Sequence, residues 1–479
     1  MKTIRLRAAC AFLVLIFIGL RLVAAAPSRQ PNILFLFADD QAFETIRAFG
    51  HTDIDTPHLD RLVARGTAFT QAANMGSWSP AVCVASRTML ITGRSVWDAE
   101  SIYKTTDAER VAGRLWPQLL AAAGYRTYFT GKWHIQAKVE AAFDVASHVR
   151  PGMPKDVPAG YNRPAPGVPD PWSPSDPKFG GFWEGGKHWS EVGADDAIGF
   201  LREAKGSVQP FFMYVAFNAP HDPRQAPAAY VDRYPTSRIA LPKSFLPEYP
   251  HSEAMGSGRT LRDEKLGPFP RTEEAVKVNR SEYYALVTHL DAQIGRILDA
   301  LDASGQADNT WIFFTADHGL AVGHHGLFGK QNMYEHSRRV PFLVVGPGVA
   351  ANRRIDAPIY LQDVMPTTLE LAGAKKPAHV FFHSLVPLLQ GKTKVSAYPA
   401  AYGAYLDRQR AVVLDGWKLI LYPKTGVARL YHLAADPDEL TDLAARPEHA
   451  SVRTKLFRQL VALQQQLGDK LDLRTTFSF

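Results

Sequence analysis

Cysteine is scarce in this chain: its 479 residues include only Cys10 and Cys83. Cys10 lies in residues 1–26, which combine a basic start, an apolar run and small residues at the end, the pattern of a cleavable secretory signal. Removal of that segment leaves Cys83 as a single thiol and excludes an internal disulfide. A lone thiol in an oxidising compartment must be buried, paired with another chain or chemically converted.

Long apolar runs are lacking after residue 26, so we expect no stable membrane insertion. Arg21 interrupts the N-terminal apolar run and Pro27 is unfavourable after a cleavage site, which leaves an uncleaved anchor as the alternative to a signal peptide. The one glycosylation sequon is Asn279-Arg280-Ser281. With no cysteine pair in the mature chain, these features favour a bacterial periplasmic or secreted protein over a lysosomal one.

Net charge is also small. The chain has 54 basic and 47 acidic residues, but residues 1–26 contain four of the basic and none of the acidic residues, so the remainder carries +3. This balance does not suit the clustered basic surface of a nucleic-acid-binding protein. A composition of 46% hydrophobic and 21% charged residues excludes a disordered chain and predicts a large core.

Strand-like and helix-like segments alternate along the chain. The pattern predicts an α/β fold: a large, mainly parallel mixed sheet with helices on both faces. After residue 395 short strands and a final helix predict a smaller α+β domain with a short antiparallel sheet, so we place a catalytic domain at 27–394 and a C-terminal subdomain at 395–479. The predicted strands are 32–37, 126–130, 211–217, 310–315, 340–345, 411–414, 418–421 and 428–432. One helix is predicted to begin at Thr56-Pro57. Further predicted helices cover 115–123, 195–204, 281–303, 363–372 and 451–467.

Two segments interrupt this alternation. Residues 136–190 are rich in proline, glycine and tryptophan, and residues 222–275 are rich in proline and charge; both are predicted to be long loops over the sheet. Within the second, residues 262–265 are interpreted as a solvated run of charges. His324 and His325 are interpreted as structural histidines.

Polar residues follow several predicted strands directly. They are Asp39, Asp40, Lys132, His134, His221, Asp317 and His318. Ligands bind at the carboxyl ends of parallel strands, so these residues are candidates for one site.

The remaining cysteine opens a distinctive motif. Residues 83–94 read CVASRTMLITGR. This resembles the signature of the sulfatase family, C-x-P-S-R followed by T-G-R, in which the cysteine is oxidised to formylglycine. Cys83, Ser86 and Arg87 match, as does the Thr-Gly-Arg triplet, whereas Ala85 stands where proline is commonest. The resemblance implies a maturation partner, either a formylglycine-generating enzyme or an anaerobic sulfatase-maturing enzyme.

Further blocks extend the resemblance over nearly the whole mature chain. They are the pair Asp39-Asp40, Gly131-Lys132-Trp133-His134, Asn218-Ala219-Pro220-His221-Asp222-Pro223, Thr315-Ala316-Asp317-His318-Gly319, Gly326-Leu327-Phe328-Gly329-Lys330, and Tyr431-His432-Leu433 followed by Asp436-Pro437. Each block is weak evidence by itself, but their order and their predicted positions at strand ends strengthen one another.

The resemblance implies a divalent metal, Ca²⁺ in preference to Mg²⁺, held by carboxylate oxygens. Its ligands would be Asp39, Asp40, Asp317 and His318, together with the formylglycine formed at Cys83. His318 stands where the family commonly has asparagine. An imidazole suits Ca²⁺ less well than an amide oxygen does.

The resemblance also implies catalytic roles. Arg87 and Lys132 would stabilise the formylglycine alkoxide, and His134 would accept a proton when the aldehyde re-forms. His221 and Lys330 would contact the sulfate and the leaving oxygen. His221 is the better candidate for the general acid, because the unperturbed pKa of histidine lies near neutrality.

Three functions of different kinds remain open. The first is a sulfatase acting on a sulfated carbohydrate, with choline or aryl sulfates as alternative substrates. The second is a phosphodiesterase or phosphonate hydrolase of the same superfamily, some of which also use formylglycine. The third is an inactive binding protein, which the intact catalytic blocks disfavour.

Residues 182–189 are the candidate for sugar recognition. Their two tryptophans, one cation and glycine turn suit stacking on a sugar ring, through Trp183, Lys187, His188 and Trp189. The alternative is that the aromatic side chains pack among themselves. Because these long loops exceed what a small ester needs, we expect a sulfated saccharide to be the preferred substrate.

Overall fold

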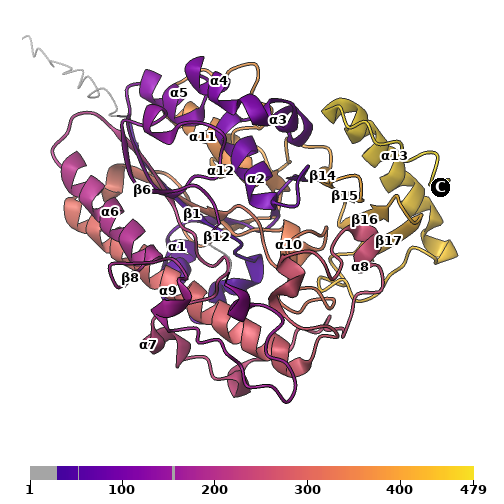
Figure 1. The fold of residues 1–479 in the computed structure, drawn as a ribbon. Coiled ribbons are helices and arrows are strands. Elements are labelled where there is room, and N and C mark those ends of the chain that lie inside the picture. Colours follow the sequence, from indigo (N-terminus) through magenta and orange to yellow (C-terminus); the bar gives the residue numbers. More distant parts are fainter. Residues whose placement is uncertain (1–29, 52, 154–156) are drawn as a thin grey trace, which may run out of the picture. The chain divides into compact units, whose positions relative to one another are not determined.

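An eight-stranded sheet forms the centre of the protein, with the strand order β12-β2-β11-β10-β1-β9-β5-β6 (Figure 1). In this computed structural model, residues 30–51, 53–153 and 157–479 are described, so the predicted signal segment lies outside the described residues. The strands are β1 (Asn32–Ala38), β2 (Thr67–Phe69), β5 (Arg126–Lys132), β6 (Val145–Arg150), β9 (Phe211–Ala216), β10 (Thr310–Ala316), β11 (Phe342–Val345) and β12 (Arg353–Ile355).

Strand direction confirms the predicted mixed sheet. β1 is parallel to β9 and β10, β9 is parallel to β5, and β5 is parallel to β6. β11 runs antiparallel to both β10 and β2. The apolar run NILFLFA of β1 is buried at every position, as expected for a central strand covered on both faces.

Helices cover both faces of this sheet (Figure 1). α9 packs against α1 and α6 on one face, and α5 contacts α2 and α11 on the other. The helices are α1 (Pro57–Arg65), α2 (Val82–Thr92), α3 (Val96–Ile102), α4 (Thr106–Val111), α5 (Trp116–Ala122), α6 (Trp189–Ala204), α7 (Ala228–Val231), α8 (Ser252–Met255), α9 (Glu273–Ser304), α10 (Glu335–Arg338), α11 (Val364–Leu371), α12 (Val386–Leu389) and α13 (Ala450–Leu467).

A second sheet has the order β17-β16-β15-β14-β4, and α13 packs against β15 and β16. Its C-terminal strands pair antiparallel, as predicted, and they are β14 (Ala401–Tyr405), β15 (Gln409–Leu414), β16 (Trp417–Tyr422) and β17 (Val427–His432). The fifth strand, β4 (Gly76–Ser77), comes from the N-terminal part of the chain and pairs parallel with β14. Two small pairs remain: β3 (Ala72–Ala73) with β13 (Ile359–Tyr360), and β7 (Trp183–Glu184) with β8 (Lys187–His188).

The two predicted loops contain more regular structure than expected. Residues 136–190 include the edge strand β6, and residues 222–275 include the short helices α7 and α8. β6 has the sequence VASHVR and is only half-buried, so it lacks the apolar run that marks an interior strand. Within the described ranges, no helix combines the length and the apolar character needed to cross a bilayer.

Candidate active site

The carboxyl ends of adjacent strands bring the predicted polar residues together. Ala38 and Ala316 are register partners in β1 and β10, so Asp39 and Asp317 emerge side by side. The backbone amide of Asp39 donates to Ala219 O at 3.1 Å, which ties the end of β1 to the segment that carries His221. Lys132 is the last residue of β5. The residues that follow these strands therefore lie close together, as predicted.

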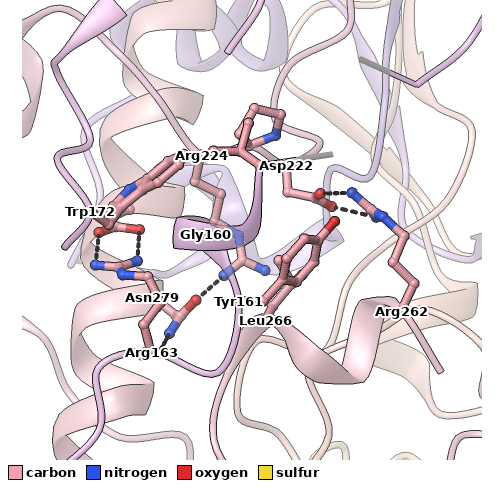
Figure 2. A pocket seen from close by; sticks show the side chains of 12 residues that line it. Gly160, Tyr161, Arg163, Trp172, Asp222, Arg224, Arg262, Leu266 and Asn279 are labelled. Carbon is pink, nitrogen blue, oxygen red and sulfur yellow. Dashed lines mark hydrogen bonds and ion pairs between the residues drawn. The ribbon is translucent and has the colours of Figure 1, made fainter. Parts of the chain in front are cut away.

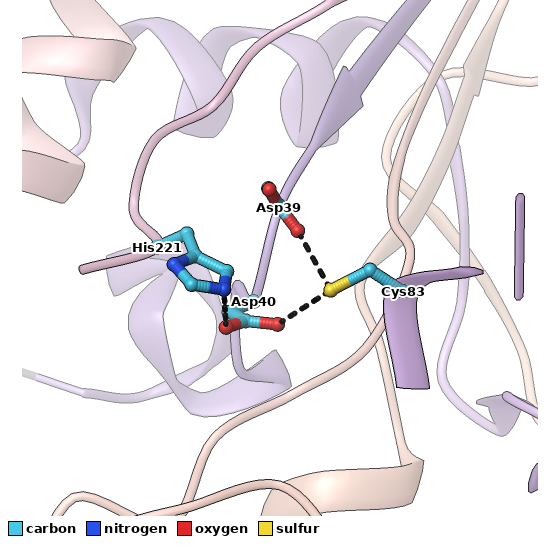
Figure 3. A group of neighbouring side chains, drawn as sticks. All are labelled: Asp39, Asp40, Cys83 and His221. Atoms are coloured by element: carbon cyan, nitrogen blue, oxygen red, sulfur yellow. Dashed lines mark hydrogen bonds and ion pairs between the residues drawn. The ribbon is translucent and has the colours of Figure 1, made fainter. Parts of the chain in front are cut away.

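Cys83 lies near the N-terminal end of α2 and faces the two paired aspartates. Its Sγ is 3.2 Å from Asp39 Oδ1 and 3.7 Å from Asp40 Oδ1. Figure 3 shows His221 on the other side of Asp40, and the ligand atoms of these four buried residues all lie within 4.8 Å of one another. Burial and the nearby Asp317 raise the pKa of the Cys83 thiol well above its ordinary value, so the unmodified side chain is a poor nucleophile.

Three buried cations face this cluster. Lys330 Nζ lies 2.6 and 2.8 Å from the carboxylate oxygens of Asp40 and 3.1 Å from Cys83 Sγ. Lys132 forms an ion pair with Asp39. The Arg87 guanidinium donates from Nε to Asp317 Oδ2 at 3.1 Å and from Nη1 to Lys132 O at 2.8 Å.

The three carboxylates respond differently to these cations. Burial alone would raise the pKa of Asp39, but Lys132 and Arg87 hold it well below its ordinary value. For Asp40, burial outweighs Lys330 and the pKa is raised; for Asp317, burial and Asp39 raise the pKa to about 6. Two of the three carboxylates thus remain short of positive charge. An oxygen-rich site of this kind suits a hard divalent cation.

The histidines of the site are neutral at pH 7. Burial, with Lys330 and Lys132 nearby, lowers the pKa of His221 to about 3. Burial and Lys132 also lower the pKa of His134 to about 3. The Nδ1 atom of His221 lies 2.8 Å from the carbonyl oxygen of Asp222 and therefore carries its proton. His221 can then act as a general acid only if the bound substrate raises its pKa.

His318 is buried, and burial lowers its pKa to about 3. Its Nδ1 faces Gly319 O at 3.1 Å, which leaves Nε2 as the atom with a free lone pair. Like Asp317, it lies outside the group of four residues whose ligand atoms converge. The predicted role of His318 as a ligand remains a prediction.

Backbone conformation contributes to the site. Gly131 precedes Lys132 with φ +101°, and a Cβ atom there would lie 1.9 Å from Ala216 O, so only glycine permits this approach of β5 to β9. Asp40 and His134 also have positive φ angles, 68° and 55°. Left-handed backbone at non-glycine residues is uncommon and concentrates at functional sites.

The charge run at residues 262–265 is solvated only at Lys265 and in part at Arg262, in contrast to our expectation for the whole run. Asp263 and Glu264 are buried. Asp263 accepts hydrogen bonds from Arg262 Nη1 at 3.0 Å and Gln331 Nε2 at 2.7 Å, and it lies 4.0 Å from Lys330 Nζ. Arg262 also pairs with Asp222, next to His221. The sequence placed Asp222 in the same matched block as His221 but gave it no role, and it gave no sign that Asp263 is buried.

The candidate sugar-binding segment at residues 182–189 forms a hairpin and the start of α6. Trp189 is buried beneath Arg150, whose guanidinium carbon is 4.0 Å from its ring centroid. His188 is also buried and caps α6, accepting from Ser190 N at 3.1 Å. Trp183 is half-buried, and Lys187 is exposed and pairs with Asp195 at 2.8 Å. Only Trp183 and Lys187 are thus placed to reach a ligand without repacking.

Comparison with known proteins identifies the family. The family model described as Sulfatase matches residues 31–374, and the one described as N-sulphoglucosamine sulphohydrolase, C-terminal, matches residues 323–466. The chain belongs to the sulfatase family. It is a sulfuric ester hydrolase, as the resemblance of its motifs implied.

Similar curated proteins span most of the chain. N-acetylglucosamine-6-O-sulfatase of Bacteroides thetaiotaomicron is 26% identical over 92% of this chain and 88% of its own length. Arylsulfatase K of Bos taurus is 28% identical, covering 90% of this chain and 82% of its own.

Solved structures share the fold. One, described as a complex with its substrate D-glucosamine-2-N,6-O-disulfate, has a TM-score of 0.72 at 23% identity and covers 92% of this chain and 99% of its own. A phosphonate monoester hydrolase from Silicibacter pomeroyi has a TM-score of 0.75 at 21% identity and covers 92% of this chain and 96% of its own.

Proposed function

We propose that this sulfatase hydrolyses sulfate esters of a saccharide, using formylglycine formed from Cys83 and a divalent metal. The observation that carries the proposal is the position of Cys83: its Sγ faces Asp39, Asp40 and Lys330 at 3.1 to 3.7 Å. Oxidation of Cys83 would place a hydrated aldehyde there, and one of its hydroxyls is the nucleophile for sulfur.

Asp39, Asp40 and Asp317 would hold the metal, with Cys83 in its modified form and His318 as further ligands. Ca²⁺ fits this set better than Mg²⁺, because a site built by several side chains suits the larger, more flexible coordination of Ca²⁺. The metal, when bound, would withdraw charge from a sulfate oxygen and lower the pKa of the formylglycine hydroxyl.

The cations of the site would stabilise the anionic sulfuryl group. Arg87 and Lys132 are fixed by carboxylates at the base of the site, so their charge is preorganised. Burial alone would lower the pKa of Lys330, but Asp40 raises it well above its ordinary value, so Lys330 stays charged beside the sulfate. His221 would donate to the leaving oxygen once the substrate anion has raised its pKa, and His134, neutral in the free protein, would accept a proton.

The substrate class is inferred from the relatives and from the side chains of the β7–β8 hairpin. A relative named for a sulfated amino sugar covers nearly the full chain. Trp183 and Lys187 offer an aromatic face and a cation for a sugar ring and an anion. Choline sulfate and simple aryl sulfates could contact Trp183 but carry no second anionic group for Lys187. Phosphonate or phosphodiester hydrolysis is the alternative reaction.

A turnover screen tests the proposal. Purified protein should be assayed against sulfated mono- and oligosaccharides, an aryl sulfate, choline sulfate and a phosphonate monoester. We expect the highest kcat/KM on a sulfated saccharide. A preference for choline sulfate or for the phosphonate would contradict the substrate class or the reaction, respectively.

We further propose that residues 1–26 direct export, so that the protein acts in a bacterial periplasm or outside the cell, with a catalytic domain at 27–394 and a subdomain at 395–479. Formylglycine would be made by one of the two maturation enzymes named above. The sequon residue Asn279 is buried within α9 and binds Arg224, which makes it unsuitable for glycosylation in the folded protein. Mass spectrometry of the exported protein would identify the N-terminus.

A further inference from the structure

A small cavity lies beside the candidate active site, next to His221. It is enclosed by Asp222, Arg224, Trp172, Tyr161 and Asn279, among others (Figure 2). Asp222, one of its walls, lies 3.2 Å from His221 Nδ1 through its Oδ1. The volume of the cavity is about 20 Å³. That space accommodates one water-sized atom or group.

Two side chains of this cavity have buried N–H groups without an acceptor. Arg224 is 3% exposed, and although its Nη1 donates to Asn279 Oδ1 at 2.6 Å, its Nε and Nη2 are buried without a hydrogen-bond partner. The indole Nε1 of Trp172 is also buried without a partner. Buried donors of this kind are rarely left unsatisfied in proteins. Since both groups can only donate, the missing partner is an acceptor.

The acidic residues of the cavity wall already have partners. Asp222 forms an ion pair with Arg262. Glu282 accepts two hydrogen bonds from Arg163, at 2.7 and 2.8 Å. Among the described residues, no carboxylate forms an ion pair with Arg224 within 4.0 Å. Burial lowers the pKa of the Arg224 guanidinium although Asp222 and Glu282 act to raise it, so these carboxylates compensate its charge only in part. A water molecule would satisfy the free N–H groups but would add no negative charge.

We propose that this cavity is an anion subsite in which Arg224 and Trp172 bind one anionic atom. The anion has two possible sources: an oxygen of a second anionic substituent on the saccharide, such as an N-sulfate or carboxylate, or a free halide. The first source rests on the proposed action on sulfated saccharides. It would make the enzyme selective for sugars that carry two anionic groups, because the cavity adjoins the residue that faces the leaving oxygen.

The first experiment measures selectivity. Glucosamine 6-O-sulfate and D-glucosamine-2-N,6-O-disulfate share one sulfate ester and differ in the second anionic group. We expect wild-type protein to prefer the disulfate, and Arg224→Gln to reduce the ratio of the two kcat/KM values by about 10- to 100-fold, mainly through KM, as loss of a charge-assisted hydrogen bond does. Trp172→Phe removes the indole N–H and part of the ring but no charge, so it should reduce the ratio less than Arg224→Gln does.

The second experiment measures anion binding without turnover. Thermal unfolding of the Cys83→Ala protein is compared in sodium chloride and sodium gluconate at equal ionic strength, with and without Arg224→Gln. If a halide is the occupant, chloride raises the unfolding midpoint only when Arg224 is present, and the substrate ratio is unchanged by Arg224→Gln. Arg202→Gln, an exposed arginine at the end of α6, is the matched control and should behave like wild type in both experiments.

The outcomes separate this inference from the proposed function. If no saccharide is hydrolysed, the proposed substrate class fails, while the chloride experiment still tests the subsite. The anion subsite is wrong if a folded Arg224→Gln protein and a folded Trp172→Phe protein match wild type in both the substrate ratio and the response to chloride. Circular dichroism and the unfolding midpoint establish that each variant is folded.

Discussion

Two charged segments of this protein differ in whether their ion pairs connect to the cluster around Cys83. At residues 262–263, Arg262 pairs with Asp222, beside His221, and Asp263 lies 4.0 Å from Lys330 Nζ. At the β7–β8 hairpin, Lys187 pairs with Asp195 on the adjacent helix α6, and both side chains are exposed. The first network is continuous with the cluster around Cys83, whereas the second ends at the surface.

This difference teaches that burial and connectivity decide what a charge contributes. An exposed ion pair is screened by water and contributes roughly 0 to 1 kcal/mol. A buried charge next to the reacting groups fixes their positions and their pKa values, so its loss affects turnover. We therefore expect substitutions in the cluster around Cys83 to reduce turnover most and substitutions in the hairpin to reduce it least.

The largest effect is expected at Cys83. Cys83→Ala should abolish turnover, because the nucleophile is lost, while the fold persists since alanine fits the same helix. Peptide mass spectrometry of the active protein should show an aldehyde at position 83 in place of a thiol. Full activity of protein with an unmodified thiol would exclude the mechanism proposed here.

The next largest effect is expected at the carboxylates. Asp39→Asn, Asp40→Asn and Asp317→Asn should each lower metal content and reduce kcat/KM by about 10³-fold or more, because each removes a charged ligand. Elemental analysis measures the metal, and readdition of Ca²⁺ after chelation should restore wild-type activity. Normal activity in protein shown to be free of metal would contradict the metal assignment.

The cations of the site come third. Arg87→Gln and Lys330→Ala should reduce turnover by about 10²- to 10³-fold, as the loss of one electrostatic donor does. The effect should appear in kcat, because these groups act on the charge that develops in the transition state. A change confined to KM would mean that they bind the sulfate in the ground state only.

A smaller effect is expected where the buried network touches Lys330. Asp263→Asn keeps the shape of the side chain and removes its charge, and it should lower kcat/KM by about 10-fold, the low end for a residue that orients a catalytic group. Asp195→Asn, which removes the ion pairs of Asp195 with Lys187 and Arg296, is the matched control and should leave kcat/KM unchanged. Equal losses in both variants would remove the distinction between the two segments.

The smallest effect is expected at the hairpin itself. Trp183→Ala and Lys187→Ala should lower kcat/KM for a sulfated saccharide several-fold, by loss of one stacking contact or one exposed charge, and should spare a small aryl sulfate. Steady-state kinetics on both substrates measures this. Equal losses on the two substrates would assign the hairpin a supporting role in the fold.

Much of the central sheet was predictable, because its interior strands are continuous apolar runs. β1, β9 and β10 and the polar residues that follow them could be located by composition alone. The start of α9 could not: Glu273 begins the helix eight residues before the predicted start, where Thr272 caps it by accepting from Ala275 N. That segment has charged and polar residues and gains its helical stability from packing.

Some side chains are buried by residues far away along the chain, and this burial could not be predicted from the sequence. The charges at residues 262–264 resemble a surface run until Arg271, Gln331 and Lys330 are placed against them. Likewise the aromatic residues at 182–189 suggest a sugar platform until Arg150 is seen to cover Trp189. In both cases the deciding contacts come from segments far away along the chain.

The pairing of β4 with β14 has a consequence for the order of events during synthesis. Gly76 and Ser77 lie shortly before Cys83 and pair with Ala404 and Tyr405, so this pairing, which lies against α2, forms only after the C-terminal strands have been made. In the finished fold Cys83 is 2% exposed, beyond the reach of another enzyme. An enzyme that oxidises this thiol would therefore have to act before the C-terminal strands have folded into place, whether the chain is still being synthesised or is already complete.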